Sequence, residues 1–251
     1  MSTHFKGPIH GAQNAAGGLL ADAEMSLVAR RDQLVYFNDF LEVDDFGTGD
    51  WTETDIGTVT VGSALQLTDV VGGQLSLVPD ATDNEGQHIQ YTAATGAGEF
   101  LVPEAGRTIV FEARVKAGDW DGQDYFIGIA ETSATLLSAA GALDSDNCVG
   151  FLHQIADAGI ISCVYAGTAA ANETDAGDAN AAVFTNDEFH TFGVRVVGTD
   201  RVWFYVDGIE VQSATMGTAF DDGMCISFGN VGSGALTDSL DIDFVYVAQT
   251  R

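Results

Sequence analysis

The chain of 251 residues carries 37 acidic residues against nine basic ones, and its formal net charge of −28 makes binding to a nucleic-acid backbone a poor expectation. A hydrophobic content of 46% excludes a wholly disordered chain, and the length suits one large all-β domain that buries roughly 70–75% of its unfolded surface. The sequence contains neither an apolar run of membrane-spanning length nor a secretory signal pattern, so we expect no membrane partner and no export through a signal peptide.

The acidic excess fits two origins, adaptation to high salt or an outer surface that faces open water. Cys148, Cys163 and Cys225 are odd in number and lack the spacing of metal ligands. We therefore expect reduced, interior cysteines in a protein made in a cytoplasm. The five histidines are also scattered, so we expect no metal site and no cofactor.

Residues 1–34 differ from everything that follows, because they lack alternating apolar and polar positions and are rich in glycine and alanine. Three basic and three acidic residues balance in this segment, while the remainder is strongly acidic. These features predict an N-terminal arm that lies on another protein, and a disordered tail is the alternative. The arm residues expected at such a contact are three basic and four apolar ones: Lys6, Leu19, Leu20, Leu27, Val28, Arg30 and Arg31.

From position 35 to 251 the pattern is one of strands and turns, with almost no helix. In the segment 108–116, apolar residues alternate with charged ones, which puts one face of a strand in a core and the other toward solvent. The segment 166–183 reads as a long loop because it consists mainly of small residues. The strands expected from the pattern are 34–41, 57–61, 64–69, 73–78, 86–92, 107–116, 124–131, 147–155, 159–166, 189–197, 201–206, 209–214, 223–229 and 239–248.

The segment 189–212 predicts two consecutive antiparallel hairpins. Its three apolar runs are separated by a turn at 198–200 and by the pair Asp207-Gly208. An Asp-Gly pair suits a two-residue hairpin loop, because both positions need a positive φ. The fold class expected for residues 35–251 is therefore all-β, with two antiparallel layers that pack face to face.

Several of these segments together resemble the concanavalin A-like sandwiches of the laminin-G and laminarinase-type glucanase kind. The strand 111–116 (FEARVK), the hairpin 205–208 (YVDG), the opening segment 36–40 (YFNDF) and the closing strand 242–247 (IDFVYV) occur in the order that this family shows. The resemblance covers about residues 35–250 and implies a concanavalin A-like jelly roll.

The resemblance does not extend to catalysis. Those glucanases carry Glu-x-Asp-x-x-Glu on one strand, which holds two carboxyl groups about 5–5.5 Å apart. This sequence contains no such string, so we expect no catalytic residues and no enzyme activity. Trp120 lies between Asp119 and Asp121 and is a candidate for glycan contact, although such a tryptophan more often caps the end of a core. The pair Asp221-Asp222 could bind calcium, but carboxylate pairs also arise by chance in so acidic a chain.

An arm followed by a sandwich also resembles small structural proteins of tailed bacteriophages. The resemblance implies a non-enzymatic virion component, most specifically a capsid decoration protein that binds the major capsid protein through its arm and forms a homo-oligomer, a trimer in the expected case. A lectin-like carbohydrate-binding module or host-glycan adhesin is the alternative, and an atypical glycosidase comes third.

Overall fold

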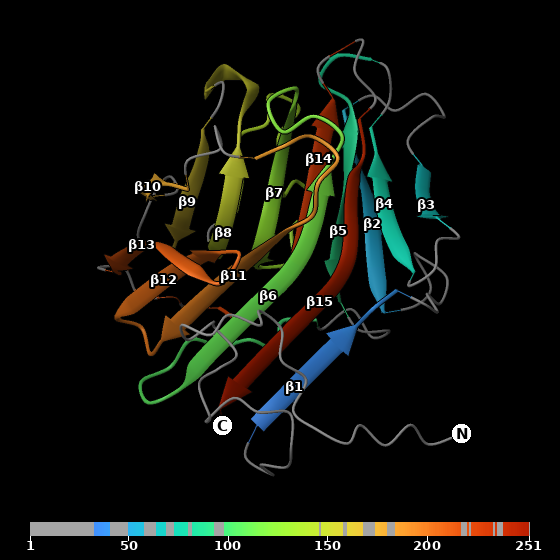
Figure 1. Cartoon of the computed structure of the whole chain (residues 1–251). Helices are drawn as coiled ribbons and strands as arrows, with labels where there is room; N and C mark the ends of the chain where they lie inside the picture. The colour runs from blue at the N-terminus through green and yellow to red at the C-terminus, as the bar shows by residue number, and fades with distance from the viewer. Residues whose placement is uncertain are drawn as a thin grey trace.

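The computed structural model describes residues 33–40, 50–57, 64–68, 73–79, 82–92, 98–145, 147–157, 160–167, 174–179, 184–216, 220, 222–232, 234 and 238–250. Within these residues the chain forms two antiparallel sheets that pack as a sandwich (Figure 1). The described helical structure is a single 3-10 turn, Ile155–Asp157. None of the described residues forms a helix that is both long and apolar enough to cross a membrane.

The eight-stranded sheet follows the order β13-β12-β11-β6-β15-β4-β3, and β1 pairs separately with β15. Its strands are β1 (Gln33–Asn38), β3 (Ala64–Thr68), β4 (Gln74–Val78), β6 (Thr108–Ala117), β11 (His190–Val197), β12 (Arg201–Val206), β13 (Ile209–Thr215) and β15 (Leu240–Thr250). The seven-stranded sheet follows the order β10-β9-β8-β7-β14-β5-β2. Its strands are β2 (Trp51–Ile56), β5 (Gly86–Tyr91), β7 (Gln123–Ala130), β8 (Cys148–His153), β9 (Ile161–Ala166), β10 (Thr174–Asp178) and β14 (Cys225–Gly232).

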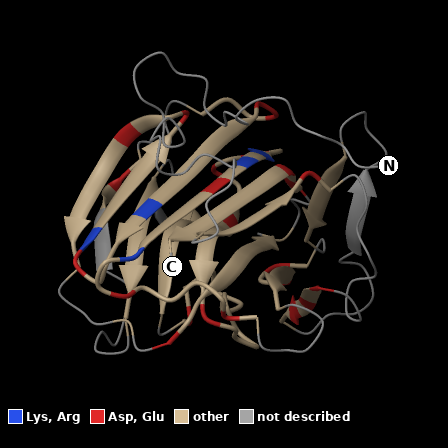
Figure 2. Ribbon diagram, turned by 90° about the horizontal axis from the view of Figure 1, so that it is seen from below, with Lys and Arg blue, Asp and Glu red and all other residues tan. Residues whose placement is uncertain are grey.

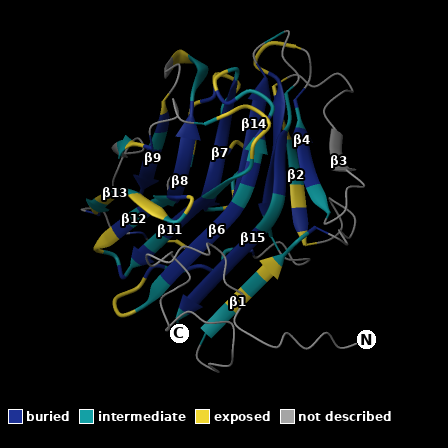
Figure 3. Cartoon of the chain, viewed as in Figure 1, coloured by how far each residue is buried: buried dark blue, intermediate teal, exposed yellow. Residues whose placement is uncertain are grey.

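The main core lies between the sheets, and the alternation predicted for the strand that became β6 holds only in part. Ile109, Phe111 and Val115 of β6 are buried against the other layer and Arg114 and Lys116 face outward, but Glu112, which was expected to face solvent, is 1% exposed. The seven-stranded sheet behaves differently, because β7, β8 and β14 are buried at every position (Figure 3). A strand that is buried at every position must be covered on both of its faces. A second layer of packing therefore covers the outer face of this sheet.

The double hairpin predicted at 189–212 is confirmed as the meander β11-β12-β13. Asp207 and Gly208 have φ values of 50° and 74°, as a two-residue turn with two left-handed positions requires. Gly198, with φ of 59°, closes the preceding turn. The three cysteines form no disulfide and are buried, so the expected interior position is confirmed.

Two strands were missed by the sequence analysis, and both lie at sheet edges. The strand β2 occupies 51–56 rather than the expected 57–61; position 57 is a bend, and 58–61 lie outside the described residues. The strand β10 falls inside the segment predicted as the loop 166–183. Acidic residues and a glycine give β10 a weak strand pattern, which is typical of edge strands that resist pairing with other chains.

The predicted arm lies almost entirely outside the described residues. Its last two positions, Gln33 and Leu34, belong to β1, where they pair with Thr250 and Gln249 of β15. The apolar and basic contact residues proposed for the arm therefore remain a prediction.

A close approach of backbones fixes the centre of the seven-stranded sheet. Gly128 of β7 pairs with Gly150 of β8, and the ring of Phe126 lies over both. A methyl group at Gly128 would lie 2.4 Å from the carbonyl oxygen of Val149, which cannot move without breaking the sheet. We predict that Gly128→Ala lowers the free energy of unfolding by roughly 1–3 kcal/mol or more.

Urea-induced unfolding would test this prediction, with Ser213→Ala as the control. Ser213 is exposed on β13, so its replacement should change stability by no more than about 0.5 kcal/mol. Equal stability of the two variants would contradict the packing described for Gly128.

Candidate functional site

The outer face of the seven-stranded sheet is covered by the chain itself. The segment between β7 and β8, residues 131–147, is called the strap below; within it, position 146 lies outside the described residues. Leu136, Leu137 and Leu143 of the strap are buried with side chains of the sheet. The complete cluster is Ile56, Phe126, Ala130, Leu136, Leu137, Leu143, Cys148, Leu152, Val164, Ala166 and Val231.

Side chains of β5 hold the start of the strap by hydrogen bonds. Gln90 donates through Nε2 to the carbonyl oxygen of Glu131 (2.8 Å) and accepts through Oε1 from the backbone amide of Ser133 (2.9 Å). The Nε2 of His88 lies 3.1 Å from the carbonyl oxygen of Ser133, and a carbonyl can only accept, so this nitrogen carries the proton. Burial lowers the pKa of His88 to about 4, so at neutral pH the ring is the uncharged donor that the contact requires.

The strap packs so closely that no added methyl group would fit beneath it. A methyl at Gly229 would lie 2.7 Å from Leu137 Cδ1, and one at Gly141 would lie 2.2 Å from the carboxylate of Asp124. Asp124 is also the only acidic residue on the central strands β7, β8 and β14. Burial raises the pKa of this carboxyl, although a hydrogen bond from the Ile155 amide opposes the shift. A single covered carboxylate cannot supply the pair that glycoside hydrolysis needs.

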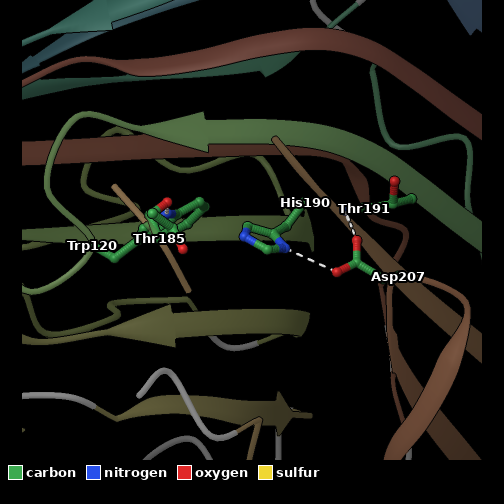
Figure 4. Close-up of polar contacts among 5 residues, drawn as sticks. All are labelled: Trp120, Thr185, His190, Thr191 and Asp207. Carbon is green, nitrogen blue, oxygen red and sulfur yellow. Dashed lines mark hydrogen bonds and ion pairs between the residues drawn. The ribbon is translucent and has the colours of Figure 1, made fainter. Parts of the chain in front are cut away.

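Trp120, the candidate for glycan contact, caps the end of the core instead. Its side chain is 1% exposed, and its Nε1 donates to the carbonyl oxygen of Thr185 at 3.1 Å (Figure 4). Tyr125 and Phe192 pack against the indole, with ring centroids 5.6 and 5.7 Å away. A buried indole offers no face to a sugar ring, so the core-capping interpretation replaces the glycan interpretation.

The turn residue Asp207 fastens the second hairpin to β11. Its carboxylate accepts from the Thr191 amide at 2.9 Å and lies 2.8 Å from Nδ1 of His190 (Figure 4). Its backbone amide donates to the Thr191 carbonyl oxygen. The Asp207-Gly208 pair therefore has two structural roles. It forms the turn, and the Asp207 carboxylate holds the first residues of β11, His190 and Thr191.

The outer face of the eight-stranded sheet carries the opposite chemistry. All lysines and arginines that lie in described strands belong to this sheet, on β6, β11 and β12, and the seven-stranded sheet has none (Figure 2). On β6, Arg114 pairs with Asp243 at 2.5 Å and Lys116 with Asp241 at 3.0 Å. The strands β11 and β12 lie between these two pairs and the edge strand β13.

Arg195, Arg201, Trp203 and Tyr205 form a group on this face that is called the Arg–Trp patch below. The guanidinium carbons of Arg195 and Arg201 lie 5.7 and 5.2 Å from the centroid of the Trp203 ring, which is within the range of cation–π contacts. Arg195 is the cross-strand partner of Trp203, and Arg201 precedes it by two residues on the same face. Within the patch, Tyr205 packs against a small cluster formed by Val110, Tyr246 and Ala248, which are buried on the outer face of the sheet.

The sequence analysis missed this patch, although the register of the predicted hairpin contained it. Once the turn at 198–200 is placed, Arg195 falls opposite Trp203, and positions 201, 203 and 205 share one face of their strand. The flanking carboxylates instead drew attention to Trp120 as the candidate for glycan contact. Among the described residues, no group of three or more His, Cys, Asp or Glu side chains could hold a metal ion; Asp221, of the candidate calcium pair, lies outside them.

Comparison with known proteins identifies the fold of the chain but assigns no activity to it. No family model and no curated protein matches the chain. A glycoside hydrolase family 16 endo-glucanase from Bacteroides ovatus superposes with a TM-score of 0.57 at 16% identity, over 84% of this chain and 99% of that one. An endo-1,3-β-glucanase from Streptomyces sioyaensis gives 0.53 at 14% identity, over 88% and 98%. The chain therefore has the concanavalin A-like sandwich fold that its sequence resembles.

The Asp207 contacts predict a pH dependence of stability. Partial burial would raise the pKa of Asp207, but hydrogen bonds from His190 and from the Thr191 amide outweigh it and leave the pKa below its usual value. A lowered native pKa contributes stability above the unfolded pKa of about 3.9, and this contribution is lost as pH falls through the native pKa. We predict that Asp207→Asn is less stable than the wild type near neutral pH and that the difference narrows in acid.

Urea unfolding at several pH values would measure this difference. Asp200→Asn, at an exposed turn position, is the matched control, and its effect should not depend on pH in this way. A constant gap between Asp207→Asn and the wild type down to the acid limit of folding would contradict the prediction.

Proposed function

We propose that this chain is a non-enzymatic virion structural protein, and more specifically a capsid decoration protein that binds the major capsid protein through residues 1–34. The proposal rests on the strap, whose apolar side chains cover the outer face of the seven-stranded sheet. On the central strands β7, β8 and β14 the covered face carries one carboxylate rather than the pair that canonical glycoside hydrolysis needs, which favours a binding role. Production in a host cytoplasm fits buried cysteines that form no disulfide.

The distribution of charge supports attachment through the arm. Residues 1–32 contain equal numbers of acidic and basic residues, so the whole net charge of −28 belongs to the sandwich and the end of the chain. Such a sandwich repels other acidic surfaces and resists aggregation when many copies crowd on a shell. The neutral arm is free of that repulsion and can approach a partner, whether a capsid protein or a sister subunit of a homo-oligomer such as a trimer.

A glycan-binding module is the second candidate, and the Arg–Trp patch favours it. Trp203 is partly exposed beside two guanidinium groups, which bind carboxylates well. The binding domain of botulinum neurotoxin DC, determined in complex with SialylT, superposes with a TM-score of 0.50 at 9% identity, over 78% of this chain and 42% of that one. That similarity concerns the fold, and glycan binding by this chain would depend on its own patch.

Co-sedimentation with assembled shells of the parent virus tests the first candidate. We expect the full chain to sediment with shells and a variant that lacks residues 1–32 to stay in the supernatant, because β1 and the sandwich remain but the apolar arm is gone. Circular dichroism of the variant is the control for folding. We also expect no turnover of β-glucans by the full chain.

Three results would contradict the proposal. If the truncated and full chains sedimented equally, the docking surface would lie on the sandwich rather than on the arm. Turnover of β-glucan that disappears when a single Asp or Glu is replaced would establish an enzyme. Binding of a sialylated oligosaccharide that is lost in Trp203→Ala, without any binding to shells, would support the second candidate instead.

A further inference from the structure

We propose that β1 is an association strand, whose residues 34–38 pair antiparallel with the same residues of a second copy of this chain about a two-fold axis. The pairing joins the two eight-stranded sheets edge to edge, so the contact lies at the rim of the sheet and not on its outer face. The inference goes beyond the proposed function and does not depend on it, because it concerns two copies of this chain alone.

The strand β1 is an edge of the eight-stranded sheet. Among the described strands it pairs with β15 alone, and in Figure 1 no described strand lies along its other side. The backbone N–H and C=O groups along such an edge are a template for a further strand, whether from the same protein or from another. An edge of this kind therefore calls for a partner or for a feature that prevents pairing.

The sequence of β1 lacks the features that natural proteins use to prevent pairing at an edge, such as charges and bulges. The strand reads QLVYFN and contains no charged residue. The edge strands β2, β10 and β13 carry acidic residues, and the pairings of β10 and β13 also contain register shifts. The strand β3 is uncharged as well, but β1 differs in its large apolar side chains that are exposed.

The exposed apolar surface of β1 follows the rim of the sheet. Val35 and Phe37 are 37% and 38% exposed, and they are two of the four large hydrophobic residues that are exposed in the described structure. Their cross-strand partners on β15, Ala248 and Tyr246, are 0% and 2% exposed. The outer face is thus covered one strand inward, and the accessible apolar side chains lie where a strand added at the edge would pack beside them.

The negative charge of the sandwich is kept away from this edge. Neither 33–38 of β1 nor 245–250 of β15, which pair with each other, includes a charged side chain. With strands about 4.8 Å apart, the first charged strand, β6, lies about 12 Å from an axis at the free edge, which is more than the screening length of about 8 Å in physiological salt. A second copy brings an edge with the same neutral, apolar character, and this match favours it as the occupant.

Symmetry fixes the register of the pairing. Directly opposed residues of an antiparallel pair lie on the same face of the sheet, so a two-fold pairing of one strand with itself must centre on a residue. A centre at Tyr36 opposes all of 34–38 and sets Val35 against Phe37 of the partner subunit, a favourable aromatic and β-branched pair. It also places the two copies of Asp39 at opposite ends of the pairing, about 20 Å apart. Because each copy uses its free edge once, association stops at two.

The molar mass of the full-length protein gives the first test. A pairing of five residues is small for a permanent interface, so we expect a dimer that dissociates on dilution. Sedimentation equilibrium should give a mass that rises from 26.3 kDa toward twice that value as concentration increases. The acidic residues elsewhere on the two sandwiches still repel each other, so the dissociation constant should fall as salt is raised from about 0.05 to 0.5 M.

Hydrogen exchange of β1 gives a readout that is specific to strand pairing. In an antiparallel pair only alternate residues bond to a given neighbour, so a strand with one neighbour protects about half of its amides and a strand between two neighbours protects all of them. We expect every amide of 34–38 to be protected in the dimer and alternate ones to lose protection on dilution. This measurement uses the unmodified chain and therefore does not depend on the folding of a variant.

Paired substitutions supply the matched comparison. Val35→Asp with Phe37→Asp should give a monomer at every concentration, because it places four carboxylates within one pairing. The control Ile209→Asp with Ser213→Asp adds the same charge at exposed positions of another edge strand, β13, and should leave the dimer intact. Circular dichroism of both variants checks that the sandwich is folded.

Three results would overturn the inference: a monomer up to the highest soluble concentration, a dimer that survives Val35→Asp with Phe37→Asp, or a dimer in which alternate amides of 34–38 stay unprotected. If the chain stays monomeric and those amides become protected only on assembled shells, the edge belongs to a capsid partner instead of a second copy. The proposed function can fail separately, because the dimer is measured without shells and the shell assay does not require a dimer.

Discussion

Burial of apolar surface on both faces of the seven-stranded sheet is the constraint on which the remaining architecture depends. Phe126 lies over the paired glycines 128 and 150, and its ring fits there because neither glycine carries a side chain. Leu136, Leu137 and Leu143 of the strap then cover the ring and its neighbours. The side chains of Gln90 and His88 supply hydrogen-bond partners for the carbonyl oxygen of Glu131 and for the amide and carbonyl of Ser133. These backbone groups of the strap therefore stay paired although the strap covers the sheet.

A concanavalin A-like sandwich has two outer sheet faces, and the strap fills the outer face of the seven-stranded sheet. The remaining outer face carries arginines and aromatic residues in an otherwise acidic molecule. Residues 1–32, which contain equal numbers of acidic and basic residues, differ in composition from this acidic remainder.

The sequence allowed most of the fold to be predicted, for physical reasons that differ between elements. Alternation in β6 and the Asp207-Gly208 turn are local signals; the turn is confirmed, and the alternation holds in part. The strand β10 could not be predicted because small and acidic residues pair there only by virtue of the neighbouring β9. The strap could not be predicted either, since Leu136, Leu137 and Leu143 are irregularly spaced and acquire a role only when the sheet exists. For Trp120 the local sequence was misleading. The carboxylates on either side suggested an exposed ring, whereas Tyr125, Phe184 and Phe192 enclose the indole.

Hydrogen exchange of the strap amides tests the closed face most directly. The amides of Thr132, Ser133 and Asp144 donate to Glu99 Oε1, Gln90 Oε1 and the Leu136 carbonyl oxygen, at 2.9 Å in each case. If the strap is an integral layer of the sandwich, these amides exchange as slowly as those of β7 and β8, through opening of the whole domain. Exchange at the rate of an unstructured peptide, while β7 and β8 stay protected, would show that the strap opens by itself and that the face beneath it is accessible.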